Sequence, residues 1–257
     1  MTYRTPASIF KRLIFAFYCS NNEEDKIVRD LHLKMLEKYI NMFDDVIFCF
    51  IINNDEDFGL VKEVEKTIIR YRNKDISFKI YENTNYREAL VYYNEIFLKM
   101  EELNGVTFFA HSKGWGNLHT KEELVAFISA AYFFSLEDLN NVHRFPFYGS
   151  LKMKNNSPSN NTPIKNEWFY VGTFFWGNYQ LVYRDHKNRF PAFSNRWFDE
   201  CFPGNLYSFE ECGSFNDEYI DATIKPINSI DLIEKIHGKN EIMNEYISLY
   251  NSLLKMV

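Results

Sequence analysis

The sequence has 257 residues, of which 46% are hydrophobic and 18% aromatic, so it is long and apolar enough to bury a core, and a disordered chain is excluded. A formal net charge of −6 argues against a protein whose affinity comes from neutralising many nucleic-acid phosphates. No stretch approaches the roughly 20 apolar residues that span a bilayer, so we expect a cytoplasmic protein.

The first part of the chain alternates short apolar segments with amphipathic ones. Residues 12–20 and 45–54 are apolar and end in polar residues, and each segment predicts a buried strand. Residues 23–43 and 58–73 carry apolar residues at helical spacing, so a helix is predicted after each strand. Strands that alternate with helices in this way indicate right-handed crossovers between parallel strands.

A third unit of strand and helix follows, and then a fourth strand. Residues 76–83 alternate apolar with polar side chains, which suits an outer strand. Residues 86–102 predict a helix, and "VTFFAHS" at 106–112 predicts the fourth strand. The fold class predicted is therefore α/β, with a Rossmann-type, mostly parallel sheet and helices on both faces.

The pattern changes after the fourth strand. Thr120 and Glu123 form a capping box at the start of an apolar helix. Residues 155–166 are polar and contain two prolines, which predicts a loop, either one that closes over a ligand or a passive insertion. Residues 167–185 are predicted to be strand with a glycine bend, and residues 194–211 an irregular, aromatic and acidic segment.

The cysteines give no sign of a metal site or of disulfides. None of the four has a C-x-x-C neighbour or histidines spaced to complete a zinc site. We therefore predict buried free thiols in a reducing compartment. The four are Cys19, Cys49, Cys201 and Cys212.

Polar residues follow the predicted parallel strands at the points where these strands end. Ser20 and Asn53 end the first two strands, and His111, Ser112 and Lys113 end the fourth. Ligands of open α/β sheets bind at the carboxyl ends of strands, so these residues predict one binding site. The phosphate-loop, nucleophile-elbow and dinucleotide fingerprints are missing, so those classes lack their usual support.

The order of elements resembles the glycosyltransferases of the GT-A fold over roughly residues 10–215. The likeness rests on the strand ends "YCSNN" and "IINNDED", on "NTNYREALVYYNEIF", and on "GTFFWGN" followed by "NRWFDECFPG". The sequence has no internal repeat and no linker composition, so one GT-A-like domain over residues 1–257 is expected. Its parts would be a nucleotide-sugar-binding half at about 10–118, an acceptor half at about 119–225 and C-terminal helices at about 226–257.

The chain departs from that family where the family carries a metal-binding Asp-x-Asp motif. His111, Ser112, Lys113 and Gly114 stand there instead. Lys113 supplies a fixed positive charge, and the glycine lets backbone N–H groups approach phosphate oxygens. We therefore predict that this turn binds the donor diphosphate and that a divalent metal such as Mn or Mg is not essential. The donor-binding candidates are Ser20, Asn53, Arg87, His111, Ser112 and Lys113.

Two carboxylates among aromatic residues are the main catalytic candidates. An inverting transfer needs a base that takes the proton of the acceptor hydroxyl, and apolar surroundings raise a carboxyl pKa. We predict Glu200 as this base, with Asp199 and His111 as further catalytic candidates. Glu210 and Glu211 compete for the role, and a retaining mechanism stays open.

The acceptor-binding candidates are mostly aromatic and each has a structural alternative. The candidates are Trp115, Trp176, Asn178 and Arg196. Trp115 could equally be a packing aromatic, and Trp176 with Asn178 could be a core strand beside a bulge. Arg196 could simply pair with a neighbouring carboxylate, as Arg87 could with Glu88.

The resemblance implies a hexosyltransferase-like enzyme that moves a sugar from a nucleotide sugar to a hydroxyl of a glycan or glycoconjugate, in surface polysaccharide or glycoconjugate synthesis. Two alternatives stay open. One is an inactive glycan- or nucleotide-binding module of the same fold, which the missing Asp-x-Asp favours. The other is a sugar transferase that acts on modified nucleic-acid bases, which the acidic net charge disfavours, and no nucleic-acid partner is expected.

Overall fold

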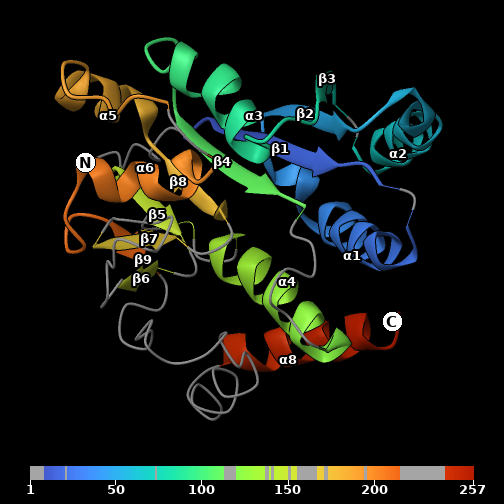
Figure 1. Cartoon of the computed structure of the whole chain (residues 1–257). Coiled ribbons are helices and arrows are strands. Elements are labelled where there is room, and N and C mark those ends of the chain that lie inside the picture. The colour runs from blue at the N-terminus through green and yellow to red at the C-terminus, as the bar shows by residue number, and fades with distance from the viewer. Residues whose placement is uncertain are drawn as a thin grey trace.

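The computed structural model describes residues 9–20, 22–72, 74–112, 120–136, 139, 142–149, 152–154, 167–170, 173–193, 196–214 and 241–257. Over these residues the protein is an α/β fold with seven α-helices and a mixed, mostly parallel seven-strand sheet (Figure 1). The strand order is β3-β2-β1-β4-β8-β5-β9. The predicted fold class is confirmed.

The first half supplies four parallel strands and three helices in strict alternation. The strands are β1 (Lys11–Tyr18), β2 (Asp45–Ile52), β3 (Ser77–Glu82) and β4 (Val106–His111). The helices between them are α1 (Glu23–Tyr39), α2 (Phe58–Tyr71) and α3 (Glu88–Glu95). As its alternating sequence predicted, β3 forms one edge of the sheet.

The second half completes the sheet with short strands. The remaining elements are α4 (Lys121–Leu136), β5 (Phe147–Gly149), β6 (Lys152–Lys154), β7 (Trp168–Tyr170), β8 (Phe175–Gly177), α5 (Tyr179–His186), α6 (Phe198–Leu206), β9 (Gly213–Ser214) and α8 (Glu241–Leu254). Strand β8 lies between β4 and β5 and runs antiparallel to both. Strands β6 and β7 form a separate two-stranded sheet.

The prediction of strand throughout residues 167–185 is wrong, because its last part is helix α5. The Asn178 side chain accepts a hydrogen bond from the Leu181 backbone N–H at 3.3 Å and so caps the helix. Tyr179 and Val182, three residues apart, then share the buried face. The dense aromatic residues conceal this helical spacing in the sequence.

The prediction that residues 194–211 are irregular is also wrong, because α6 lies within them. Phe198, Cys201 and Phe202 recur at helical spacing and are buried. Pro203 lies inside this helix. A proline normally argues against a helix interior, so the sequence misleads here.

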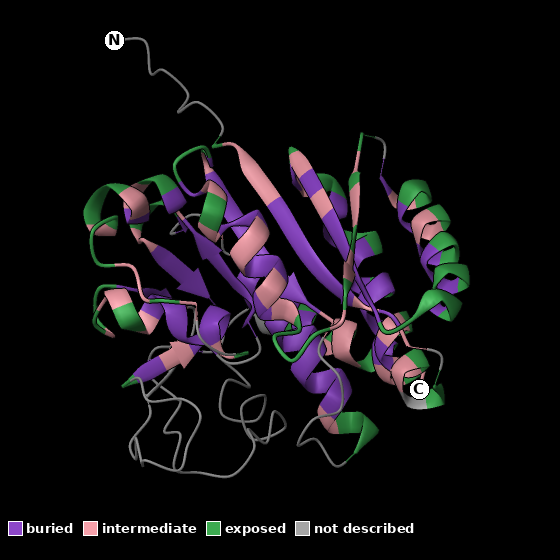
Figure 2. Cartoon of the chain, turned by 45° about the horizontal axis from the view of Figure 1, so that its top comes forward, coloured by how far each residue is buried: buried purple, intermediate pink, exposed green. Residues whose placement is uncertain are grey.

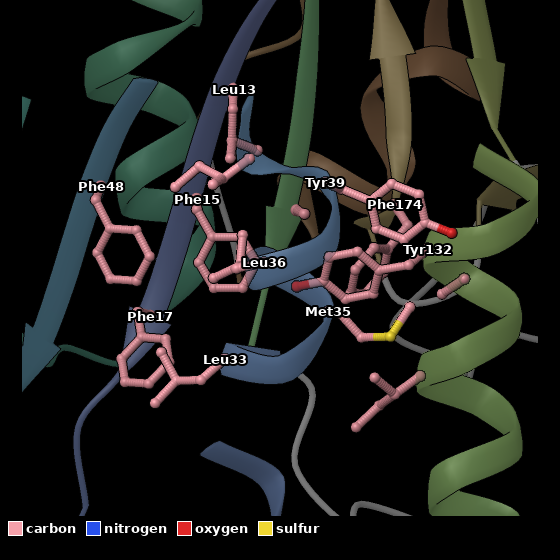
Figure 3. Packing of buried hydrophobic residues seen from close by; sticks show 14 of the residues in the cluster. Leu13, Phe15, Phe17, Leu33, Met35, Leu36, Tyr39, Phe48, Tyr132 and Phe174 are labelled. Atoms are coloured by element: carbon pink, nitrogen blue, oxygen red, sulfur yellow. The ribbon is translucent and has the colours of Figure 1, made fainter. Parts of the chain in front are cut away.

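The core lies on both faces of the sheet, because side chains alternate along each strand. Along β1, Leu13, Phe15 and Phe17 belong to the cluster packed against α1 and α4, part of which Figure 3 shows. The intervening Ile14 and Ala16 join the other cluster, with α3 and α6. Figure 2 shows the central strands buried between these two layers of helices.

Local hydrogen bonds confirm the predicted start of α4. The Glu123 backbone N–H donates to Thr120 Oγ1 at 3.1 Å, and the Thr120 N–H donates to Glu123 Oε2 at 3.2 Å. These two bonds make the predicted capping box.

The four cysteines are buried and form no disulfide bonds, as predicted. Burial, followed by the charge of Asp57, raises the pKa of the Cys19 thiol to about 12. Within the described part of the chain, no helix is both long and apolar enough to cross a membrane.

Arg72 joins the end of α2 to the segment before β2. Its side chain is buried, and Nη1 donates to the carbonyls of Ile40 at 2.9 Å and Phe43 at 3.0 Å. Nη2 donates to the carbonyl of Asp44 at 3.1 Å, and Nε donates to that of Asp75 at 3.3 Å. One guanidinium thus satisfies four backbone carbonyls from two loops.

Glu95 on α3 is a buried carboxylate that ties this helix to the edge strand β3. It accepts hydrogen bonds from Lys79 Nζ at 2.6 Å, from Lys99 Nζ at 2.7 Å and from the Tyr81 hydroxyl. Burial by itself would raise the pKa of Glu95, but these three hydrogen bonds outweigh burial, and the pKa is lowered from its ordinary value of 4.5. The ionised form is therefore the one that the fold stabilises.

We expect Glu95→Gln to lower the free energy of unfolding at pH 7 by about 2 kcal/mol, because it loses the charge-assisted bonds. A lowered folded-state pKa contributes stability above the unfolded pKa, and this stability is lost as the pH falls through the folded value. Urea denaturation of the wild type and of Glu95→Gln between pH 7 and pH 3 should show that their difference in free energy of unfolding becomes smaller as the pH falls. Glu102→Gln, at an exposed site, is the matched control, and a difference independent of pH would contradict the role of charge.

Candidate functional site

The carboxyl ends of β1 and β4 flank the point where the order of the sheet reverses. From β1 the chain proceeds to β2 and β3 on one side, whereas β4 lies on the other side of β1. Ligands of open α/β sheets bind at such a switch point. Here the Tyr18 backbone N–H donates to Ser112 Oγ at 2.7 Å, so Ser112 joins the two strand ends.

Neutral hydrogen-bonding side chains extend from this point toward the edge strand β3. The Tyr18 hydroxyl donates to Asn53 Oδ1 at 3.0 Å, and Asn83 Nδ2 donates to the same oxygen at 2.8 Å. Asn53 itself is exposed. Amides and a phenol at adjacent strand ends can both donate and accept, which suits a nucleobase or a ribose.

Sequence reasoning missed Asn83, although a signal for it was present. Asn83 follows β3 in the way that Asn53 follows β2, and its backbone N–H bonds to the carbonyl of Ile52 at 2.7 Å. Its Oδ1 is buried and makes no hydrogen bond. The rule that picks out strand ends therefore applies to the third strand as well as to the others.

Acidic side chains continue the site in the other direction. His111 ends β4 and is buried, with Nδ1 3.7 Å from Oε1 of Glu88, the first residue of α3. Asp199 and Glu200, in the first turn of α6, are also buried, and Asp199 lies close enough to Glu88 to be affected by its charge. The site thus joins residues from three elements that are far apart in the sequence.

We call the whole set the carboxyl-edge row. It runs from neutral groups at β3 to carboxylates at α6, with the switch point between them. Its members are Asn83, Asn53, Tyr18, Ser112, His111, Glu88, Asp199 and Glu200.

The Asp199 carboxyl is the most perturbed acid of the row. Burial, followed by the negative charges of Glu88 and Glu200, raises the pKa of Asp199 well above its ordinary value of 3.8. The Tyr92 and Tyr179 hydroxyls lie nearby, although no hydrogen bond of ordinary geometry joins them to either Asp199 oxygen. Asp199 is therefore a carboxyl that favours its neutral form.

Two residues near the row have strained backbones. Arg87, just before α3, has φ 49°, and Thr173, just before β8, has φ 58°. A left-handed conformation is uncommon for any residue other than glycine and is an outlier for a β-branched one, at a cost of about 1–3 kcal/mol. Nothing in the sequence predicts this conformation for Thr173, which sequence reasoning missed.

Of the described donor-binding candidates, three lie in the carboxyl-edge row and two lie outside it. Asn53, His111 and Ser112 belong to the carboxyl-edge row. Ser20 Oγ accepts the Asn22 backbone N–H at 3.4 Å, which ties it to the start of α1. Arg87 is exposed at the turn that precedes α3.

Two predicted site residues and the predicted loop fall outside the described residues. They are Lys113, Trp115 and the segment 155–166. Their roles therefore stay predictions.

The prediction that Trp176 contacts an acceptor is wrong. Its ring is buried against Phe43 and Phe108, and Nε1 donates to the carbonyl of Ser135 at 2.7 Å. The core interpretation of this strand is the one that the structure supports. Asn178 caps α5 in the same segment, so its side-chain oxygen is used within the fold.

Arg196 does not pair with the carboxylates of α6. Its guanidinium lies over the Trp197 ring, 4.2 Å from the centroid, and the side chain is exposed. A cation stacked on an aromatic ring can still contact a ligand, so its acceptor role stays a prediction.

The competing bases Glu210 and Glu211 are exposed. Glu211 Oε2 accepts the Ser208 backbone N–H at 2.8 Å, and this hydrogen bond lowers the pKa of Glu211. A carboxylate that is exposed and more acidic than usual is a weak proton acceptor. The geometry therefore favours the carboxylates of α6.

No group of three or more metal-ligating side chains occurs in the described part of the chain. A scan against protein-family models finds no match to this chain, and no curated protein matches it significantly. The function is therefore argued from the site alone.

Proposed function

We propose that this protein is a nucleotide-sugar-dependent glycosyltransferase that moves a sugar to a hydroxyl of a glycan acceptor. The observation that carries the proposal is the carboxyl-edge row, which spans the switch point and changes from neutral to acidic along its length. The two ends of such a row suit the two ends of a nucleotide sugar. Sequence resemblance to GT-A enzymes supports the same assignment.

The neutral end suits the nucleoside. Tyr18, Asn53 and Asn83 offer both donors and acceptors at strand ends, and they carry no charge that would favour a phosphate. The strand end that contains Ser112 continues in the sequence into Lys113 and Gly114. A lysine and a glycine that follow Ser112 in the sequence would stabilise the leaving diphosphate.

The acidic end suits the acceptor. As the acceptor hydroxyl attacks the anomeric carbon it must lose its proton, and a carboxylate within hydrogen-bond reach is a suitable base. Glu200 is buried and lies in the first turn of α6. Asp199 favours its neutral form, so we assign the base to Glu200.

Thermal unfolding with UDP-, GDP-, dTDP- and CMP-sugars tests the proposal, each with Mn or with a chelator. A ligand at about 100 times its dissociation constant adds about 2.7 kcal/mol and should raise the Tm by about 5–10 °C. We expect one nucleotide class to stabilise the wild type with or without metal. Lys113→Ala should lose this shift, whereas Lys62→Ala, an exposed lysine on α2, should keep it.

The other outcomes separate the alternatives. A shift with Mn alone would show that the turn needs a metal. If no nucleotide sugar shifts the wild type and glycans do, the protein is a binding module without transfer chemistry.

A further inference from the structure

Two fully buried polar side chains, one beside the carboxyl-edge row and one within it, make no side-chain hydrogen bond of ordinary geometry. They are Thr173, through Oγ1, and Asp199, whose Oδ1 and Oδ2 are approached by the backbone N–H groups of Asp199 and Glu200. Buried hydroxyl and carboxyl groups are nearly always hydrogen-bonded, because desolvation without a partner is unfavourable. Thr173 and Asp199 therefore have hydrogen-bonding capacity that the fold leaves unused.

Thr173 lies two residues before strand β8. Strand β8 pairs antiparallel with β4, with Phe175 opposite Phe109. The chain therefore enters β8 beside the carboxyl end of β4, the end at which His111 lies. The neighbouring Phe174 ring lies 6.0 Å from the His111 ring, which agrees with this placement.

Asp199 approaches the same residues from the helix side. It lies close enough to be affected by the charge of Glu88, whose Oε1 is 3.7 Å from His111 Nδ1. The segment just before β8, which contains Thr173, and the first turn of α6, which contains Asp199, therefore both approach the pair His111 and Glu88. Thr173 adopts a left-handed φ of 58°, which costs about 1–3 kcal/mol.

The chemistry of the two groups selects a ligand class. A hydroxyl and a neutral carboxyl each donate and accept, so they complement hydroxyl groups. A phosphate can only accept and would be repelled by the carboxylates of Glu88 and Glu200. The described residues also gather no set of three ligands for a metal ion.

We propose that Thr173 and Asp199 bind hydroxyl groups of the sugar that is transferred, and that this sugar is neutral at the positions they contact. The inference rests on the proposed function, and it assigns Thr173 a binding role that no sequence motif suggests. Thr173 and Asp199 are binding residues here, whereas Glu200 keeps the role of base.

The stability of Thr173→Val provides the first test. Valine keeps the shape and the β-branch of threonine and removes only the hydroxyl. Because this hydroxyl has no partner in the protein, the Tm should be unchanged or higher. A lower Tm would show that the hydroxyl is needed by the fold and would overturn the inference.

Tyr207→Phe is the matched control. Its hydroxyl is also buried without a partner, and its ring packs on Phe147. Phe147 pairs with Gly177, which pairs with Thr107 at the other end of β4 from His111. Tyr207→Phe should therefore leave stability no lower and binding unchanged.

Binding provides the second test, measured by titration calorimetry. The ligands are a nucleotide sugar that stabilises the wild type in the thermal-unfolding experiment and the corresponding free nucleoside diphosphate. Thr173→Val should bind the nucleotide sugar about tenfold more weakly than the wild type does. Its affinity for the free diphosphate should equal that of the wild type. Asp199→Ala should likewise weaken binding of the nucleotide sugar and leave binding of the diphosphate unchanged. Thr173→Ser, which keeps a hydroxyl, should bind the nucleotide sugar as the wild type does.

The outcomes distinguish the two proposals. If the wild type binds nucleotide sugars and Thr173→Val binds them equally well, this inference is wrong and the proposed function stands. If Thr173→Val loses the diphosphate as well, the residue does not act through the sugar, and the inference is also wrong. If the wild type binds no nucleotide, the proposed function fails and this inference falls with it.

Discussion

Replacing Glu200 with glutamine is expected to lower kcat about a thousandfold, which corresponds to about 4 kcal/mol of transition-state stabilisation. Glutamine has the shape of glutamate but cannot take the proton of the acceptor hydroxyl. Donor affinity should change little, because the base acts on the acceptor. The measurement is the release of nucleoside diphosphate from the donor, with water or an added glycan as acceptor.

The controls for this result are the other acidic residues of the same segment. Glu210→Gln and Glu211→Gln change exposed carboxylates and should leave kcat within about twofold. A kcat of Glu200→Gln equal to that of the wild type would contradict the assignment of Glu200 as the base. A drop in both kcat and donor affinity would instead indicate a rearranged site.

Replacing Arg72 with methionine is expected to lower the free energy of unfolding by about 3 kcal/mol and the Tm by about 10 °C. Methionine preserves much of the side-chain volume but donates no hydrogen bond. Four backbone carbonyls, those of Ile40, Phe43, Asp44 and Asp75, would lose a charged donor. Equilibrium urea denaturation, with the m-value checked for two-state behaviour, measures the loss.

Arg70→Met is the matched control for this prediction. Arg70 lies in the last turn of the same helix but is exposed, so its replacement should change stability by no more than about 0.5 kcal/mol. Equal losses in the two variants would show that the four carbonyls are not what Arg72 stabilises.

The parallel half of the fold could be predicted from the sequence because its signals are local. Each of β1, β2 and β4 is an apolar run of six to eight residues, and each is followed or preceded by a helix with its own apolar stripe. The Thr120 and Glu123 capping box was predicted because both of its hydrogen bonds span three residues. Asn53 and Ser112 were placed at the site by the rule that ligands bind at strand ends.

The second half could not be predicted in the same way, because nonlocal packing decides it. Helices α5 and α6 form in segments so rich in aromatic residues that helical and strand spacing look alike. Trp176 is a core residue because β8 inserts next to β4, which no local pattern shows. The closeness of His111, Glu88 and Asp199 likewise depends on how α3 and α6 pack on the sheet.

The position of β8 between β4 and β5 affects how the chain folds during its synthesis as well as how the finished sheet is arranged. His111 at the end of β4 and Phe175 at the start of β8 are 64 residues apart, so a ribosome adding about 5–20 residues per second takes roughly 3 to 13 seconds between them. During that interval one side of β4 has no partner strand, and an unpaired apolar edge readily pairs with another chain. The late arrival of β8 therefore makes the nascent protein most prone to aggregation just after its four parallel strands have emerged.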